Sequence, residues 1–309
     1  MKLISVVSGC FNEAENIEDF VSRVQAVFDK LPQYRLEILV IDNASTDGTP
    51  DILRTLATAE PRLKVILNAR NFGHIRSPHH ALMQAGGDAA LTLASDLQDP
   101  PELIPQFLEK WEEGFKAVVG VKNESEESRI FFFIRRSYYR LIHRLAEFDI
   151  IQNFTGFGLY DRAVVDYCRG LDDPYPYFRG LISEIGLPTA KIPFVQPRRK
   201  RGITKNNFYT LYDIGMLGIT NHSKVPLRLA TMMGFAMSLL SLLTALAYLA
   251  YKLIFWYNFP VGLAPIIIGL FLFSSVQLFF IGILGEYIGA IHTQVLKRPL
   301  VVEKERINF

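Results

Sequence analysis

Two long stretches near the C-terminal end of the chain contain no charged residue, and they restrict the fold more than any other feature. Leu229–Tyr251 runs for 23 residues without Asp, Glu, Lys or Arg, and Leu253–Gly285 runs for 33. A helix needs roughly 20 apolar residues to cross a bilayer. Buried helices of water-soluble proteins rarely run so far without charge, so we expect a transmembrane hairpin within residues 225–290, with helices at about 227–251 and 262–285. The alternative is a pair of long helices buried in a soluble protein.

Basic residues flank both outer ends of this hairpin. Lys224 and Arg228 precede it, Lys297 and Arg298 follow it, and aromatic side chains gather in the connector at 256–260. By the positive-inside rule, this pattern predicts that both ends lie in the cytoplasm and that the connector faces outward. A strand-like segment begins at the first residues, so we expect no signal peptide. The two cysteines fit a reducing compartment, and the net charge of +2 gives no reason to expect nucleic acid as a partner.

The first 120 residues alternate short β-rich runs with helical patterns. Strands are predicted at Ile4–Val7, Glu37–Ile41, Lys64–Leu67, Ala89–Leu93 and Ala117–Val121, and helices at Ala14–Phe28, Thr49–Leu56, His79–Ala85 and Glu102–Gly114. This alternation predicts an α/β fold with a mainly parallel sheet and helices on both faces. Ligands of such sheets bind beyond the carboxyl ends of the strands.

Polar clusters follow four of these strands, at 11–13, 42–49, 70–73 and 95–102. Each cluster taken alone is also typical of a turn with a helix N-cap, which is the role that we expect for Asp47–Thr49. In the last cluster, Asp96 and Gln98 are two residues apart, so on an extended strand end both side chains would point the same way. A hard cation such as Mg²⁺ takes one or two protein oxygens and completes its shell with water and phosphate. The alternatives are a metal-diphosphate site and a plain surface turn.

Two further segments are typical of a membrane surface. Residues 129–147 mix Phe and Tyr with Arg, and 206–220 form a second candidate for an interfacial helix, within a juxtamembrane linker at 206–224. The alternative for 129–147 is a basic helix docked on the domain. Between them lies the basic run at 198–205. It suits anionic headgroups and also suits a bound phosphate, because Gly202 allows a close backbone approach and arginine grips phosphate oxygens.

The motifs occur in an order that resembles a known family. The chain reads "FNEAENI", "VIDNASTDGT", "RNFGH", "GGDAALTLASDLQDPPELIP" and "GFGLYDRAVV", then "RRKRGITK" before the hairpin and "GILGEYIG" within it. This set resembles the family 2 glycosyltransferases, specifically the dolichyl-phosphate mannose synthase and bactoprenol glucosyltransferase type, over nearly the whole chain. The resemblance implies a cytoplasmic GT-A domain at 1–205, a cytoplasmic tail at 291–309 and a place in the inner (plasma) membrane.

The resemblance also implies a reaction and its residues. The reaction is the inverting transfer of a sugar from a UDP- or GDP-sugar to a polyprenyl phosphate. The nucleotide sugar is expected at Glu13, Asp42, Asn43, Asn71 and Asp96, Mg²⁺ or Mn²⁺ at Asp96 and Gln98, and the acceptor phosphate at Arg199, Arg201, Thr204 and Lys205. Asp96 and Asp99 are the residues expected at the reaction centre. Some relatives assemble as tetramers, so a homo-oligomer is also implied.

The sequence departs from the family pattern at three places. The usual Pro before the Asn-Glu pair is absent, Asn43 stands where a second Asp is common, and Ala94 occupies the first position of the usual Asp-x-Asp. The last change removes one metal or sugar contact. It also keeps open a rival interpretation, a non-catalytic membrane scaffold derived from such an enzyme. A polysaccharide synthase is a further alternative, although neither tryptophan follows an arginine and two spans are few for a polymer channel.

Overall fold

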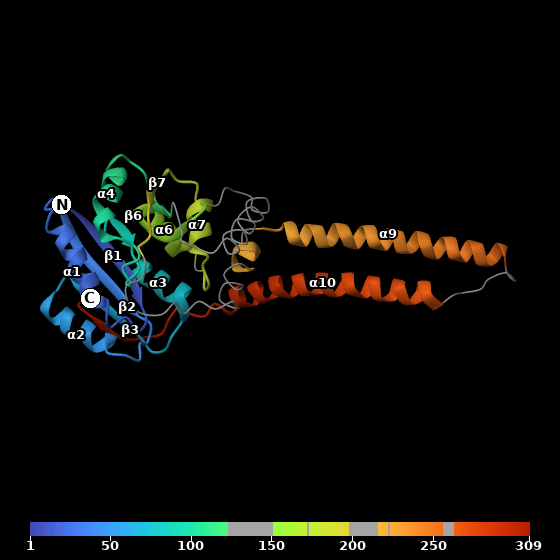
Figure 1. Ribbon diagram of the computed structural model, residues 1–309, viewed down its shortest axis with the longest axis horizontal. Helices are drawn as coiled ribbons and strands as arrows, with labels where there is room; N and C mark the ends of the chain where they lie inside the picture. The colour runs from blue at the N-terminus through green and yellow to red at the C-terminus, as the bar shows by residue number, and fades with distance from the viewer. Residues whose placement is uncertain (123–150, 172, 198–215, 222, 256–262) are drawn as a thin grey trace.

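The computed structural model describes residues 1–122, 151–171, 173–197, 216–221, 223–255 and 263–309 (Figure 1). Residues 129–147, where an interfacial helix is expected, lie outside this part of the chain, as does most of the second candidate at 206–220. The expected acceptor-phosphate residues at 199–205 also lie outside it. Their assignment stays a prediction.

The first half of the chain alternates strands and helices as expected. The elements are β1 (Lys2–Cys10), α1 (Ile17–Phe28), β2 (Tyr34–Asp42), α2 (Thr49–Ala59), β3 (Leu63–Asn68), α3 (Gly73–Gln84), β4 (Ala89–Thr92), the 3-10 turn η1 (Pro101–Leu103), α4 (Ile104–Glu112) and β5 (Ala117–Lys122). The five predicted strands are therefore confirmed. Helix α3 begins at Gly73, six residues before the predicted start at His79. The prediction missed its first turn because a proline stands inside the helical pattern.

The second half adds elements that the sequence patterns did not indicate, namely β6 (Phe154–Asp161), α6 (Arg162–Gly170), α7 (Phe178–Glu184), β7 (Thr189–Phe194) and β8 (Glu303–Ile307). It also contains the two long helices expected for the hairpin, α9 (Val225–Ile254) and α10 (Leu263–Leu296). The eight strands form one sheet in the order β7-β5-β6-β4-β1-β2-β3-β8. Strand β1 pairs in parallel with β2 and β4, whereas β6 and β8 pair antiparallel with their neighbours. The predicted mainly parallel sheet is confirmed.

Apolar side chains fill both faces of the sheet. Helices α1, α2 and α4 cover one face, with Phe20, Leu53 and Phe107 in the core between them. Helices α3, α6 and α7 cover the other, where Leu82, Val165 and Ile182 pack. The seven C-terminal residues of β2 are all buried, which is typical of a strand in the middle of a parallel sheet. Helices on both faces were expected, and this arrangement directs the carboxyl ends of β1, β2 and β4 to one edge.

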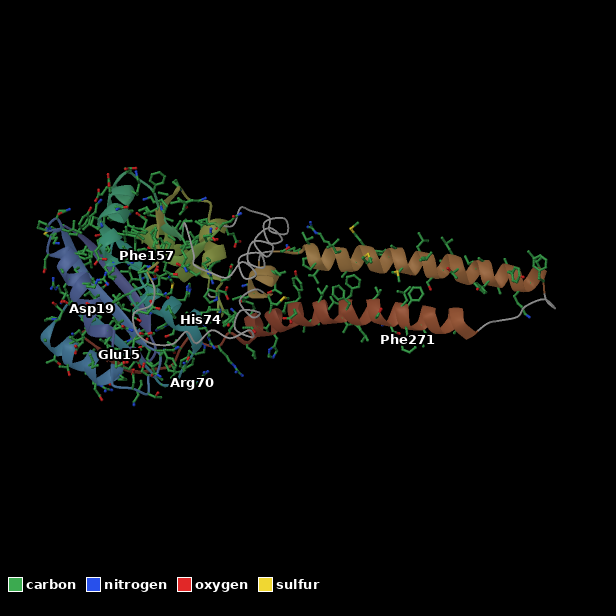
Figure 2. All side chains as sticks on the ribbon, viewed as in Figure 1. Glu15, Asp19, Arg70, His74, Phe157 and Phe271 are labelled. Carbon is green, nitrogen blue, oxygen red and sulfur yellow. The ribbon has the colours of Figure 1, made fainter. Side chains whose placement is uncertain are left out.

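Two long helices extend away from the sheet side by side (Figure 1). Helices α9 and α10 contain segments with mean hydropathy of 1.8 and 1.7, and none of these segments is buried. Phe235 is 74% exposed and Phe271 is 69% exposed. Figure 2 shows Phe271 on α10, well clear of the domain. Both helices are long and apolar enough to cross a membrane, and their exposure disagrees with the alternative of two buried helices.

The segment after the hairpin is structured rather than a separate tail. Helix α10 continues to Leu296, beyond the expected end at 285, and its base contacts the domain through Gln294 Nε2, 2.8 Å from Asp173 Oδ1. Strand β8 then pairs antiparallel with β3. Within the expected tail at 291–309, residues 303–307 thus belong to the sheet of the N-terminal domain. The sequence "EKERI" has no apolar alternation by which to recognise such an edge strand.

Candidate active site

The loops after β1, β2 and β4 meet at one edge of the sheet. The register places Cys10 opposite Asp42 and Val7 opposite Thr92, so the three strands end close together. Each following loop contains a non-glycine residue in the left-handed region: Asn12 at φ 56°, Ala44 at φ 59° and Leu97 at φ 61°. Such backbone is costly for residues other than glycine and concentrates at functional sites. The edge predicted to bind ligand is therefore the edge with unusual backbone.

The first two loops are joined by hydrogen bonds. Asn12 Oδ1 accepts from Thr46 N at 2.8 Å, and the backbone N of Glu13 donates to Thr49 Oγ1 at 3.0 Å. Asp47 accepts from both Thr49 N at 3.0 Å and Ala14 N at 3.2 Å. Burial opposes ionisation of Asp47, but the hydrogen bonds from Thr49 and Ala14 prevail and lower its pKa. The expected turn at Asp47–Thr49 is confirmed, and it also positions Glu13.

Asp42 is buried at the end of β2, with 1% of its surface exposed. Its Oδ2 accepts from Ser45 N at 2.9 Å, its Oδ1 accepts from Ser45 Oγ, and Cys10 Sγ lies 3.6 Å from Oδ1. The carboxylate thus holds the loop of Ala44 in shape. Glu13, 8% exposed, is anchored by Asn16 Nδ2 at 2.6 Å from its Oε2. Asp42 and Glu13, both expected at the nucleotide sugar, are thus buried and fixed at the ends of neighbouring loops.

Asn43 joins the end of β2 to the loop after β3. Its Nδ2 donates to Asn71 Oδ1 at 2.8 Å and to Gly73 O at 3.2 Å, and its Oδ1 accepts from Phe72 N at 2.8 Å and Asn68 Nδ2 at 3.2 Å. Four hydrogen bonds use the whole capacity of an amide side chain. Asn43 therefore positions exposed Asn71 and the start of α3. Asn43 and Asn71, both expected at the nucleotide sugar, thus lie together, and Asn71 is the exposed one that a ligand can reach.

The loop after β4 is a turn, which corrects the strand-end argument for Asp96 and Gln98. Strand β4 ends at Thr92, and Leu97 adopts the left-handed conformation. The Oδ1 of Asp96 accepts from Gln98 N at 3.1 Å, and Asp99 Oδ2 accepts from Ala94 N at 3.0 Å. The two-residue alternation of a strand does not apply here. Asp96 and Gln98 remain close because the Asp96 carboxylate closes the turn that carries both.

Asp99 is the most buried carboxylate of this turn, with 6% of its surface exposed. Burial raises the pKa of Asp99 to about 7, the hydrogen bond from Ala94 N opposes this rise, and the charge of nearby Asp96 adds to it. Asp161, by contrast, lies outside the site. It accepts from Trp111 Nε1 at 2.8 Å, from Lys116 Nζ at 3.2 Å and from Ala163 N at the start of α6 at 3.1 Å.

The oxygen ligands at this edge fit a hard divalent cation that is held mostly by its substrate. Within the described ranges there is no group of three or more His, Cys, Asp or Glu residues placed to hold a metal ion. Asp96 supplies one carboxylate and Gln98 one amide oxygen, which is the small protein share that Mg²⁺ accepts when phosphates and water complete its shell. A self-contained metal site of the zinc type does not fit these residues.

A cavity of about 320 Å³ adjoins Asp99 and Ala94. Its walls come from α3, from the start of β6 and from α7 with the loop before it. They include His74, His79, Gly156, Tyr177 and Arg179. Gly156 adopts φ 105°, and its carbonyl accepts from Tyr160 Oη at 2.9 Å. Sequence reasoning missed the α7 residues, because they lie some 80 positions after Asp99 with no motif of their own.

Comparison with known proteins agrees with this geometry. Residues 5–168 match the family described as Glycosyl transferase family 2. The uncharacterized glycosyltransferase YkcC of Bacillus subtilis is 34% identical over 96% of this chain and 92% of its own. The SfII prophage-derived bactoprenol glucosyl transferase of Shigella flexneri is 33% identical over 98% of this chain and 97% of its own. A prophage bactoprenol glucosyl transferase homolog of Escherichia coli K12 is 31% identical over 97% and 98%.

A solved structure supports the fold. Mannosyl-3-phosphoglycerate synthase from Rubrobacter xylanophilus superposes with a TM-score of 0.51 at 16% identity, over 70% of this chain and 71% of its own. The mixed sheet is that of a GT-A fold. With a family match over more than half of its length and near-full-length relatives above 30% identity, the chain belongs to glycosyltransferase family 2 and is a glycosyltransferase.

Proposed function

We propose that this enzyme transfers a sugar from a UDP- or GDP-sugar to a polyprenyl phosphate at the cytoplasmic face of the inner membrane. One observation carries the proposal. The relatives named bactoprenol glucosyl transferase align over 97–98% of this chain, so the similarity includes α9 and α10 as well as the sheet domain. An acceptor that resides in a membrane explains why a catalytic domain and an exposed apolar hairpin belong to one unit.

The donor occupies the edge formed by the loops after β1, β2 and β3. In this arrangement Glu13 and Asp42 face the nucleoside, Asn71 contacts it from the loop ordered by Asn43, and Asp96 faces the diphosphate. Asp96 and Gln98 would hold Mg²⁺ or Mn²⁺, and when bound the metal stabilises the negative charge that develops on the leaving diphosphate. Support comes from the shared edge and from the unusual backbone of the loops after β1, β2 and β4.

The ionisation state of the acceptor phosphate determines which groups the enzyme must supply. A phosphate monoester loses its second proton near pH ~6, so its oxygen is already an anionic nucleophile at neutral pH. A single in-line displacement inverts the configuration of the sugar and needs placement of the two substrates more than proton removal. We infer that no protein carboxylate acts as an obligatory general base. Asp99 then shapes the sugar side of the turn, and Asp161 stabilises α6.

The membrane arrangement follows from the charge pattern and the two exposed helices. We propose that α9 and α10 cross the membrane and that the domain and both termini lie in the cytoplasm. The absence of a further pair of helices within the described residues favours a lipid product over an extruded polymer.

A direct assay tests the proposal. The purified full-length protein, in detergent with Mg²⁺, is incubated with undecaprenyl phosphate and a panel of radiolabelled UDP- and GDP-sugars. We expect label from one nucleotide class to enter the lipid extract and to be released as free sugar by mild acid. Binding of a nucleotide sugar without transfer in any combination would support the scaffold alternative, for which Ala94 is the suggestive residue. Label in a water-soluble polymer would support a polysaccharide synthase.

A further inference from the structure

Two basic side chains, His74 from α3 and Arg179 from α7, line the cavity beside Asp99. They are close enough to interact: the pKa of His74 is lowered first by loss of hydration and then by the charge of Arg179. Neither residue forms an ion pair with a carboxylate of the described residues, and the guanidinium of Arg179 instead lies 5.7 Å from the ring centroid of Tyr177. An arginine in this setting favours an anion, above all a phosphate.

The remaining walls of the cavity are mostly apolar. Ile75 and Pro78 from α3 face Phe157, Pro176 and Phe178 across it. A free phosphate or a nucleotide diphosphate gains little from such walls, whereas a phosphate joined to a hydrocarbon gains about 25 cal/mol for each Å² that it buries. The combination of an arginine and a hydrogen-bonding imidazole with apolar walls therefore favours an amphiphilic anion.

A second hollow lies next to this cavity, at the base of the hairpin. A groove of about 440 Å³ lies between α7 and α10. Its apolar and aromatic lining residues are Leu171, Tyr177, Leu181, Tyr287, Ile291 and Val295, and its polar ones include Asp173, Glu184 and Gln294. Tyr177 lines both the groove and the cavity. Figure 1 shows α3 and α7 on the side of the domain nearer to α9 and α10, and Figure 2 places His74 on that side. The two hollows thus lie in sequence between the apolar helices and the turn of Asp96 and Asp99.

We propose that the acceptor lipid enters along the groove between α7 and α10 and presents its phosphate to Arg179 and His74, with the first isoprene units against Ile291 and Leu181. This inference rests on the proposed function, because it takes the acceptor to be a polyprenyl phosphate. It assigns Arg179 as a phosphate-binding residue in addition to the basic run at 198–205. It also gives α7 a role in recognition, with Tyr177 at the junction of tail and phosphate.

The phosphate contact is tested with Arg179→Gln, Arg179→Lys and the control Arg35→Gln. Arg35 is exposed near the opposite end of β2, so its loss changes net charge alone. We expect Arg179→Gln to raise the KM for undecaprenyl phosphate by at least about 10-fold, in keeping with the loss of a charge-assisted hydrogen bond. The KM for the nucleotide sugar stays within 2-fold, and Arg179→Lys recovers part of the loss. An equal rise in both KM values would assign Arg179 to the diphosphate and overturn the inference.

The lipid path is tested with Ile291→Trp, which fills the groove, against Ile288→Trp one turn earlier on the exposed surface of α10. A photoreactive benzophenone analogue of polyprenyl phosphate supplies a readout that does not require turnover. We expect its crosslinks on α7 and on residues 287–295, and we expect Ile291→Trp to remove them while Ile288→Trp does not. Crosslinks confined to α9, or equal crosslinking of both variants, would overturn the path. If the wild type transfers no sugar to any polyprenyl phosphate, the proposed function itself fails, whereas wild-type transfer with unaffected variants rejects only this inference.

Discussion

Asp96 and Asp99 belong to one short turn but differ in their surroundings. Asp96 is half-buried and closes the turn through Gln98 N, so it lies where a ligand can reach it. Asp99 is buried against Ala94 N, on the wall of the cavity. Asp96 is therefore placed to interact with the leaving diphosphate of the proposed donor, whereas Asp99 shapes the cavity beside it.

Neutralising Asp96 is expected to stop the reaction without unfolding the protein. Asp96→Asn keeps the size of the side chain but removes its charge, so transfer should fall by at least about 100-fold, as for other losses of transition-state charge stabilisation. EDTA should silence the wild type in the same assay. Asp19→Asn, an exposed change on α1, serves as the charge-matched control and should remain active. Full wild-type activity in EDTA would show that the reaction does not need a metal ion.

Neutralising Asp99 and Asp161 separates positioning from base catalysis. Asp99→Asn should retain turnover within about 10-fold, because the acceptor phosphate is already ionised near neutral pH. Asp161→Asn should leave kcat unchanged but lower the melting temperature, since it loses contacts to Trp111, Lys116 and the first turn of α6. A kcat for Asp99→Asn as low as that of Asp96→Asn, with both substrates still bound, would demonstrate a protein base.

The placement of single residues at the sheet edge was predictable where a motif follows a strand, and the partners that the fold brings together were not. Glu13, Asp42, Asn43, Asn71 and Asp96 each follow an apolar run, and the sheet brings these runs to one edge. The finer division of labour was not visible in the sequence, because the commitment of Asn43 to the loop of Asn71 depends on hydrogen bonds between separate loops. His74 and Arg179 meet only through the packing of α3 and α7.

At the scale of elements, one buried carboxylate joins three strands and a turn. Glu37 on β2 accepts from Lys64 Nζ on β3 at 2.7 Å, from Ser5 Oγ on β1 and from Gly86 N at 2.9 Å. Ser5 Oγ in turn accepts from Gly87 N at 2.8 Å. The turn between α3 and β4 is thereby fixed to the sheet, on which the position of the Asp96 turn depends.

Glu37→Gln is expected to destabilise the domain by about 1–3 kcal/mol, because the part-buried Lys64 loses its charged acceptor on the buried Glu37. Burial opposes ionisation of Glu37, but hydrogen bonds from Lys64, Ser5 and Gly86 lower its pKa below 4.5. The contribution is thus complete above about pH 5 and is lost as the pH falls through the folded-state pKa. Melting temperatures of wild type and variant should differ at pH 7, by about 2–4 °C per kcal/mol, and converge in acid. Glu113→Gln, in an exposed pair with Lys110, should match wild type at both pH values.

The elements that sequence analysis recognised are those with a strong apolar period. Strands β1 to β5 contain buried runs flanked by turn residues, whereas β7 alternates over only six residues with a proline inside it and β8 is charged. Strands β7 and β8 join the sheet by pairing with the edges of β5 and β3. No local pattern in the sequence indicates this pairing.

At the scale of the whole molecule, the hairpin and the domain are one connected unit. Tyr287 Oη donates to Ser223 O at 2.5 Å at the base of the two helices, and Arg76 Nη2 donates to Pro299 O at 2.6 Å where the chain returns to the sheet. These contacts place the ligand edge and the apolar helices on the same side of the domain (Figure 1).

The topology is open to cysteine labelling. Cys10 and Cys168 are both buried, so a membrane-impermeant maleimide reports on an introduced thiol alone. Asn258→Cys, in the connector, should react in intact cells, because the charge pattern places it outside. Lys304→Cys, exposed on β8, should react only after permeabilisation. The reverse pattern for the two positions would invert the proposed orientation.

Strand β8 has a consequence for the order in which the protein is made. The chain leaves the sheet after β7, forms both long helices, and only then supplies the strand that covers the edge of β3. A ribosome synthesises the chain from the N-terminus onward, so the edge of β3 stays uncovered until the hairpin has been synthesised. An uncovered edge is a template for pairing with other chains. Insertion of the hairpin into the bilayer and completion of the sheet are therefore coupled in time. A nascent chain stalled before residue 303 exposes the edge of β3 to pairing with other chains, whereas in the finished chain the short, charged strand β8 covers that edge.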